Sequence, residues 1–172
     1  MVGWDVADTP RRRSMVEVAL RSVEDRDLDT LYELMRDPES VRMAAFVARD
    51  PDDREAFDRH MAKLRNSPDL IVRAVTGDGR FLGTIGRFFV EGDAEITYWI
   101  DRAVWGQGIA SRALALFLEM VEVRPLHARA ASDNLGSLRV LEKAGFSVIG
   151  TEVAYAAARG GEIEETVLRL DL

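Results

Sequence analysis

A glycine-containing turn at residues 105–110 has the residue types and the spacing of a site for an anionic group. It reads Trp-Gly-Gln-Gly-Ile-Ala, follows an alternating apolar run typical of a strand, and leads into a segment with helical spacing. Two glycines let the backbone turn tightly and approach a ligand closely, and the first N–H groups of a helix attract negative charge. The stretch therefore predicts a site for a phosphate-bearing molecule, with a plain strand-to-helix turn as the alternative.

Two common nucleotide-binding motifs do not match this turn. No Gly-Lys-Ser/Thr follows it, as a P-loop requires, and Arg112 stands near the position of the third glycine of a G-x-G-x-x-G fingerprint. The identity of the ligand must therefore come from other parts of the chain.

Composition limits the classes of function. The 172 residues suit a single domain. The formal net charge of -7 disfavours non-specific nucleic-acid binding and suits a cationic partner, such as an amine or a basic peptide. The sequence contains no cysteine, which excludes disulfides, thiolate metal sites and a cysteine acyl-enzyme. His60 and His127 show no metal-ligand spacing, so we predict no metal.

The sequence shows no signal for a membrane or for export. No apolar run approaches the roughly 18 residues that a membrane span requires, so no membrane association is expected. The basic cluster at residues 11–13 is not followed by the apolar region of an export signal. The cytoplasm is therefore the expected location.

The residues that could do chemistry must be positioned by helices and strands that the patterning predicts. Residues 1–13 lack sustained periodicity and are predicted to form a flexible tail, whereas residues 14–172 are predicted to form one domain. Pro38 is predicted to end the first helical region and Asp50 to cap the second helix. The predicted strands are 15–20, 70–76, 80–90, 96–100, 126–131, 146–153 and 164–170, and the predicted helices are 25–35, 50–64, 108–121 and 134–144.

A second informative stretch covers residues 131–146, with the sequence ASDNLGSLRVLEKAGF. Together with WGQGIASRAL at residues 105–114, it resembles the GNAT superfamily of acyl-CoA-dependent N-acyltransferases, and within it the group of ribosomal-protein-alanine N-acetyltransferases. The resemblance covers residues 15–172. It implies an α/β (α+β) fold with a central mixed, mostly antiparallel sheet of about six to seven strands. The sheet is expected to be splayed in the middle and flanked by about four helices.

The resemblance also implies acetyl-CoA as co-substrate, bound in the gap of the sheet with its pyrophosphate on the turn. The family's Arg/Gln-x-x-Gly-x-Gly/Ala pattern falls on Trp105, Gly108 and Ala110, and Trp105 replaces the usual Arg or Gln. Asn134 matches a polar contact to the pantetheine arm, with a plain helix N-cap as its alternative. The residues expected to bind the cofactor are Ile100, Asp101, Trp105, Gly106, Gln107, Gly108, Ile109, Ala110, Asn134 and Ser137.

The catalytic assignments rest on the same resemblance. Glu95 matches a position that often holds the base, with a solvated strand carboxylate as its alternative. Many members of the family carry a Tyr as the acid for the leaving thiolate, but Leu141 stands at that position here. The candidate acid is therefore Ser137, whose alternative is a small residue packed beneath the cofactor. Tyr98, Trp99 and Phe88 are expected either to line the acceptor cleft or to be part of the core.

The acceptor is expected to be a primary amine, either a protein N-terminal α-amine or a small amine. A lysine amine of pKa ~10.4 costs about 4.6 kcal/mol to deprotonate at pH 7, whereas an α-amine of pKa ~7.8 costs about 1.1 kcal/mol. A modest base therefore suffices for an α-amine. A non-catalytic acyl-CoA-binding module is the alternative function, and a Ser-His-Asp hydrolase is disfavoured because no G-x-S-x-G motif occurs. A monomer or a homodimer is expected, and residues 36–50 and 155–162 are expected to form acceptor loops without a recognisable signature.

Overall fold

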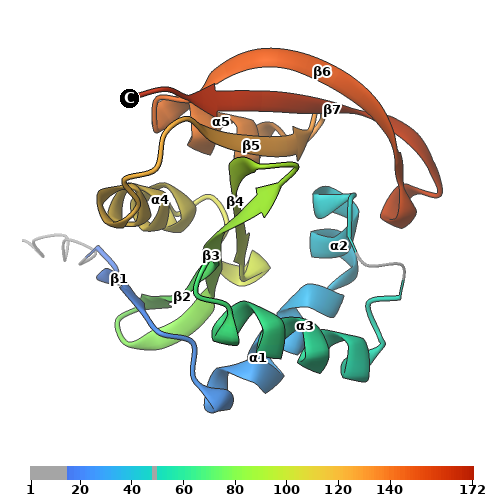
Figure 1. Cartoon of the computed structure of the whole chain (residues 1–172). Helices are drawn as coiled ribbons and strands as arrows, with labels where there is room; N and C mark the ends of the chain where they lie inside the picture. The colour runs from blue at the N-terminus through green and yellow to red at the C-terminus, as the bar shows by residue number, and fades with distance from the viewer. Residues whose placement is uncertain (1–14, 48–49) are drawn as a thin grey trace, which may run out of the picture.

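The computed structural model describes residues 15–47 and 50–172, so the predicted tail at residues 1–13 lies outside the described part. A mixed sheet runs through the molecule in the order β1-β2-β3-β4-β5-β7-β6 (Figure 1). Its strands are β1 (Val18–Arg21), β2 (Ile71–Gly77), β3 (Arg80–Val90), β4 (Asp93–Ile100), β5 (Leu126–Ala131), β6 (Ser147–Ala156) and β7 (Gly161–Leu170). Five α-helices accompany the sheet within the described residues: α1 (Leu28–Arg36), α2 (Pro38–Ala44), α3 (Arg54–Asn66), α4 (Ile109–Met120) and α5 (Leu135–Lys143). The predicted fold class is confirmed.

The middle of the sheet is splayed. Strands β4 and β5 are the one parallel pair in the described sheet, and their register holds only Ala94 opposite Leu126 and Glu95 opposite His127. By contrast, β3 and β4 pair continuously from Gly83 to Val90. Beyond Glu95 the two parallel strands therefore separate, as the family resemblance implied, and the sheet opens toward the carboxyl end of β4.

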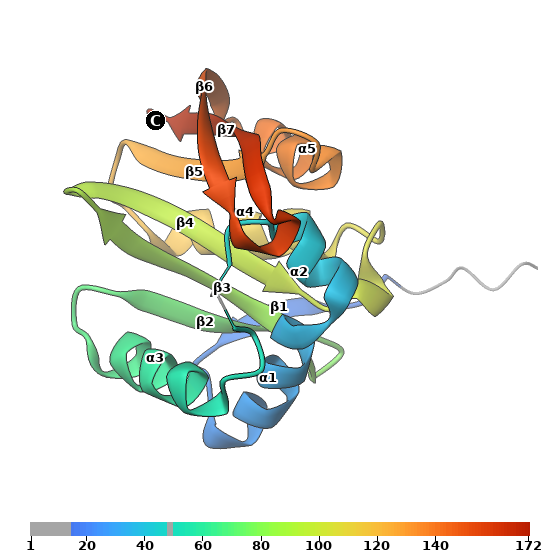
Figure 2. The ribbon, with the colours of Figure 1, turned by 90° about the vertical axis from the view of Figure 1, so that its right-hand side faces the viewer.

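The two faces of the sheet carry different helices (Figure 2). Helices α4 and α5 cover one face, where Leu114 and Phe117 of α4 are fully buried in the main hydrophobic core. Helices α1 and α3 cover the opposite face around a smaller core that includes Leu31 and Met61. Burial of each such side chain contributes about 1.5–3 kcal/mol. Both sides of the splayed region are consequently held by rigid, packed elements.

Helix α2 was not predicted. Asp37 accepts a hydrogen bond from the backbone N–H of Ser40 at 3.0 Å, and Pro38 occupies the first turn of the new helix. Proline suits that position because the first N–H groups of a helix have no internal partner. The prediction that Pro38 ends the helical region was therefore incomplete: Pro38 separates α1 from a second helix. The predicted cap of α3 was also displaced, since Asp53 and not Asp50 caps it.

Candidate active site

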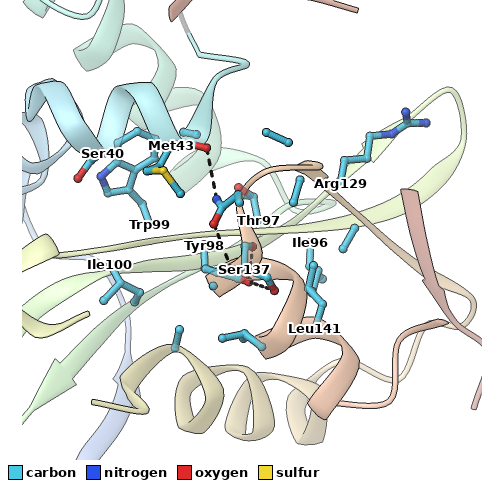
Figure 3. A pocket seen from close by; sticks show the side chains of 18 of the residues that line it. Ser40, Met43, Ile96, Thr97, Tyr98, Trp99, Ile100, Arg129, Ser137 and Leu141 are labelled. Carbon is cyan, nitrogen blue, oxygen red and sulfur yellow. Dashed lines mark hydrogen bonds between the residues drawn. The ribbon is translucent and has the colours of Figure 1, made fainter. Parts of the chain in front are cut away.

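A cavity of about 640 Å³ occupies the splayed region between β4 and β5 (Figure 3). This volume is in the range of small-molecule sites. The turn before α4 and the first turn of α4 line one part of the cavity, Glu95, Arg129 and Glu165 line another, and α2 contributes Ser40, Met43 and Ala44. Ser40, Met43 and Trp99 lie on one side of the cavity, and Ser137 and Leu141 lie on the other (Figure 3).

The glycine turn is shaped for a ligand rather than for packing. Gly106 and Gly108 have φ values of 74° and 75°, in the left-handed region that side-chain-bearing residues rarely adopt. A Cβ added at either position would meet no atom within 4 Å, so the space in front of the turn is open. The first bond inside α4 runs from the Arg112 N–H to the Gly108 carbonyl at 3.1 Å. The N–H groups at residues 109–111 precede that bond and are suited to an anion.

The Arg112 side chain stabilises this turn through hydrogen bonds to backbone carbonyl groups. Its Nε donates to the Gly108 carbonyl at 3.2 Å, its Nη2 donates to the Gln107 carbonyl at 3.1 Å, and its Nη1 donates to the Val16 carbonyl. The guanidinium thus takes the carbonyl groups of the turn and leaves the N–H groups for a ligand. The sequence did not predict this role of Arg112, because the partners of its side chain depend on the folded turn.

The exposed edge of β4 faces the cavity. The Asp101 N–H donates to the Leu82 carbonyl of β3 at 2.8 Å, so strand alternation turns the backbone polar groups of Tyr98 and Ile100 toward the gap. The Trp105 indole donates to the Ile100 carbonyl at 2.8 Å and occupies one of these groups. The remaining groups at Tyr98 are suited to pair with an extended ligand, much as an added strand would.

The structure does not bring every predicted cofactor residue to the cavity. The side chain of Asp101 accepts from the Ala103 N–H at 2.9 Å, lies 3.4 Å from Arg80 and does not line the cavity. Gln107 is also absent from the lining residues of the cavity in the described chain. The other predicted cofactor residues line the cavity; they are Ile100, Trp105, Gly106, Gly108, Ile109, Ala110, Asn134 and Ser137.

Asn134 uses both ends of its amide group. Its Oδ1 accepts the Ser137 N–H at 3.1 Å and caps α5, and its Nδ2 donates to the Met43 carbonyl of α2 at 3.3 Å. The alternative interpretation of Asn134 as a helix cap is confirmed. Asn134 also joins α2 to the start of α5, which the sequence did not indicate.

The aromatic candidates lie on both sides of the cavity. The Tyr98 hydroxyl is 2.7 Å from the Ser137 Oγ on the α5 side. The Trp99 indole donates to the Leu34 carbonyl of α1 at 3.0 Å, on the opposite side. Both rings and Phe88 line the cavity. Burial raises the pKa of Tyr98 to about 12, and its hydrogen bond with Ser137 opposes that rise, so the phenol stays protonated at neutral pH.

Glu95 belongs to a charged cluster centred on Arg129 of β5. The Arg129 Nε donates to Glu95 at 3.1 Å and its Nη1 donates to Glu152 at 2.6 Å, while Glu165 lies 3.6 Å away. Glu95 is only 6% exposed, so the alternative of a solvated strand carboxylate is wrong. The hydrogen bond with Glu152 raises the pKa of Arg129, burial opposes the rise, and Glu95 adds to it. Burial raises the pKa of Glu165 above its ordinary value.

Three carboxylates therefore surround one guanidinium in this cluster. Glu95, Arg129 and Glu165 line the cavity, and they come from β4, β5 and β7. The excess of negative charge suits a cationic ligand at this end. The sequence did not identify Arg129 or Glu165, because only the register that sets Ala131 opposite Glu165 brings their strands together.

The β6–β7 hairpin extends alongside α2, and its tip contacts that helix (Figures 1 and 2). At its tip, in the short helix η3 (Ala157–Arg159), Arg159 pairs with both oxygens of Asp133 at 2.8 and 3.0 Å and donates to the Arg42 carbonyl at 2.7 Å. The Ala158 N–H donates to the Ala45 carbonyl at 3.3 Å. The two segments predicted to be acceptor loops are thus joined, and the first of them contains helix α2.

Within residues 15–47 and 50–172, no group of three or more His, Cys, Asp or Glu side chains is arranged to hold a metal ion. No helix in the same part of the chain is long and apolar enough to cross a membrane.

Comparisons with known proteins agree with this geometry. The family model described as an acetyltransferase (GNAT) domain matches residues 17–147. A Bacillus subtilis (strain 168) protein named Probable N-acetyltransferase YjcK is 38% identical over 77 residues, which are 40% of this chain and 42% of that protein. The match to this relative therefore spans less than half of its length.

Solved structures show the same fold at low identity. Mycobacterium smegmatis RimJ in complex with CoA-disulfide has a TM-score of 0.75 at 22% identity, covering 90% of this chain and 81% of that chain. The ribosomal-protein-alanine N-acetyltransferase from Brucella melitensis has a TM-score of 0.76 at 20% identity, covering 90% of this chain and 99% of that chain.

Proposed function

The chain belongs to the acetyltransferase (GNAT) domain family, and on this premise we propose that it transfers the acetyl group of acetyl-CoA to a primary amine. The observation that carries the proposal is the cavity in the splayed sheet, with an anion-binding turn at one end and a carboxylate cluster at the other. The turn suits the pyrophosphate of the cofactor, and the free edge of β4 suits its extended arm. The cluster suits the ammonium group of the acceptor.

The reaction proceeds by direct attack in a ternary complex. The amine must lose a proton to become nucleophilic, and Glu95 is assigned as the base, acting directly or through water. Arg129 engages Oε1 of Glu95, and no hydrogen bond from the described residues engages Oε2. We assign that oxygen to take the proton of the acceptor amine. The nitrogen then attacks the thioester carbonyl, and the Ser137 hydroxyl donates a hydrogen bond to the departing sulfur.

An α-amine is the preferred class of acceptor. Its deprotonation at pH 7 costs about 1.1 kcal/mol, against about 4.6 kcal/mol for a lysine side chain. Glu95 is a single carboxylate that is already paired with a guanidinium, so we expect it to be a modest base. A modest base suits the lower deprotonation cost of an α-amine. A protein N-terminus and a small α-amine both satisfy this requirement.

Saturating acetyl-CoA tests the cofactor assignment. At ~100 times its Kd, a ligand of the native state stabilises it by about 2.7 kcal/mol, which is roughly 5–10 °C in Tm for a chain of this length. If neither acetyl-CoA nor CoA raises the Tm, the proposal is contradicted.

Release of free CoA, measured with a thiol reagent against N-terminal peptides and small amines, tests catalysis. The chain itself has no cysteine to interfere with the reagent. We expect release with at least one α-amine acceptor. A Tm shift without release for any amine would instead favour the non-catalytic acyl-CoA-binding module.

A further inference from the structure

Two hydroxyl groups from different elements meet in the cavity. Tyr98 extends from β4 and Ser137 from the first turn of α5, and their oxygens are 2.7 Å apart. Both side chains line the cavity (Figure 3). We propose that Tyr98 is a positioning residue, which holds the Ser137 hydroxyl so that its hydrogen is directed at the sulfur of the departing thiolate. This inference rests on the proposed function.

The geometry gives the Tyr98 hydroxyl two acceptors on one residue. It lies 2.7 Å from the Ser137 Oγ and 3.3 Å from the Ser137 carbonyl oxygen. When Tyr98 donates to Oγ, that oxygen has an acceptor position filled and its own hydrogen is free for a third atom. Because Ser137 lines the cavity, that hydrogen is available to a ligand there. Without Tyr98, a serine hydroxyl in a helix tends to bond to the carbonyl one turn earlier and to turn away from a ligand.

Tyr98 is suited to this role because it is rigid and stays protonated. Its ring is half-buried in the core between β4 and α5, and its register opposite Ile85 of β3 fixes the position of its backbone. Val140 and Leu141 on the same helix as Ser137 line the cavity without any hydrogen to donate. The hydroxyl pair is therefore a donor group to which α5 and β4 each contribute one side chain.

The pKa values of the phenol and of a thiol indicate that Tyr98 donates a hydrogen bond and does not lose its proton. The phenol has a pKa of about 12, whereas an ordinary thiol has a pKa of ~8.5, so equilibrium disfavours transfer of the phenol proton to a thiolate by about 3,000-fold. As the C–N bond forms and the C–S bond breaks, the electron pair of the C–S bond stays on sulfur. The pair of hydroxyls stabilises that charge. The proton lost by the nitrogen passes through the base and solvent to sulfur, so the products are the amide and CoA.

The first test is a mutant cycle on the rate of CoA release. We expect Ser137→Ala to lower kcat by about 10²–10⁴ and Tyr98→Phe to lower kcat by about 10–100-fold, with the KM for acetyl-CoA nearly unchanged. The double variant should be no slower than Ser137→Ala, because Tyr98 acts through Ser137. Multiplicative losses, or a Tyr98→Phe variant with full kcat and a raised KM for the amine, would overturn the proposal.

Tyr32→Phe is the matched control. Tyr32 is also buried and its hydroxyl donates to one carbonyl, that of Asp52, at 2.7 Å, but it does not line the cavity. It should lose comparable stability and keep its kcat. An equal loss of kcat in the control would make the effect of Tyr98→Phe a consequence of destabilisation.

A second test needs no acceptor and so separates this inference from the proposed function. Near pH 9 a thiol of pKa ~8.5 is largely ionised, and the hydroxyl pair should favour the thiolate of bound CoA. We expect Tyr98→Phe to weaken CoA binding by about tenfold and to leave the affinity for acetyl-CoA nearly intact. Equal changes for both ligands would refute positioning. If wild type releases no CoA with any amine but this difference persists, the catalytic function fails and the positioning holds.

Discussion

The two ends of the cavity are built in different ways. The cofactor end is made of backbone from one contiguous turn, residues 105–111, with Arg112 holding its carbonyl groups. The end proposed for the acceptor is made of side chains from β4, β5 and β7. A backbone site is expected to tolerate changes of side chain but not changes of backbone conformation. A site made of side chains should instead be sensitive to the substitution of single side chains.

The largest effect is expected from a change of backbone at the cofactor end. Gly108→Val places a branched side chain at a φ of 75° and in the open space that the ligand needs. We expect loss of the whole acetyl-CoA-induced Tm shift of about 5–10 °C and of CoA release. The strain itself costs about 1–2 kcal/mol and lowers the Tm of the unliganded protein.

Gly79→Val is the control for that strain. Gly79 has a φ of 79° and open space around it, but it lies in the β2–β3 hairpin. It should show the lower unliganded Tm and keep the acetyl-CoA shift. A full shift in Gly108→Val would show that the turn does not hold the cofactor.

The next effect concerns one side chain at the acceptor end. Glu95→Gln keeps the shape and removes the base, so kcat/KM should fall by about 10²–10⁴ at neutral pH. The loss should shrink as pH rises, because the free amine becomes abundant without a base. Recovery should be nearly complete by about pH 9 for an α-amine of pKa ~7.8, but not for lysine at ~10.4. The measurement is the pH profile of CoA release.

Glu152→Gln is the matched control for Glu95→Gln. Glu152 shares the Arg129 guanidinium, but it is exposed on β6 and does not line the cavity. It should change kcat/KM little at any pH. A loss in Glu95→Gln that is independent of pH would assign Glu95 to attraction of the acceptor or to the structure of the strand.

The smallest effect is expected at the contact between α2 and the hairpin tip. Arg159→Ala removes the pair with Asp133 and the bond to the Arg42 carbonyl. Because the pair is partly exposed, the loss of stability should be about 1 kcal/mol, or roughly 2–4 °C in Tm. The KM for the amine should rise while the acetyl-CoA shift is kept.

Arg59→Ala is the control at an exposed ion pair, since Arg59 lies 3.7 Å from Glu55 on α3 and is 68% exposed. It should change neither the Tm nor the KM for the amine appreciably. A reduced acetyl-CoA shift in Arg159→Ala, with an unchanged KM for the amine, would place this contact at the cofactor end and contradict the comparison of the two ends.

Local patterns were sufficient for much of the fold. The strands from β2 to β5 and the start of α4 follow from alternation, from the Gly77-Asp78-Gly79 turn and from the glycine turn, because each pattern acts within a few residues. Helix α2 escaped prediction because a proline is compatible both with the end of one helix and with the first turn of the next. Only the Asp37 cap, formed in the structure, separates these two outcomes.

The sequence by itself predicted the glycine turn that we propose for the cofactor, since a turn of this kind before a helix creates its anion-binding groups from contiguous backbone. Only the tertiary structure decided the acceptor end and the hydroxyl pair. Glu95 meets Arg129 across 34 residues, and Tyr98 meets Ser137 across 39 residues. Such contacts depend on the register of β4, β5 and β7 and on the angle at which α5 packs. No local pattern of residues encodes either quantity, because both are set when the two halves of the sheet pair and separate around the cavity.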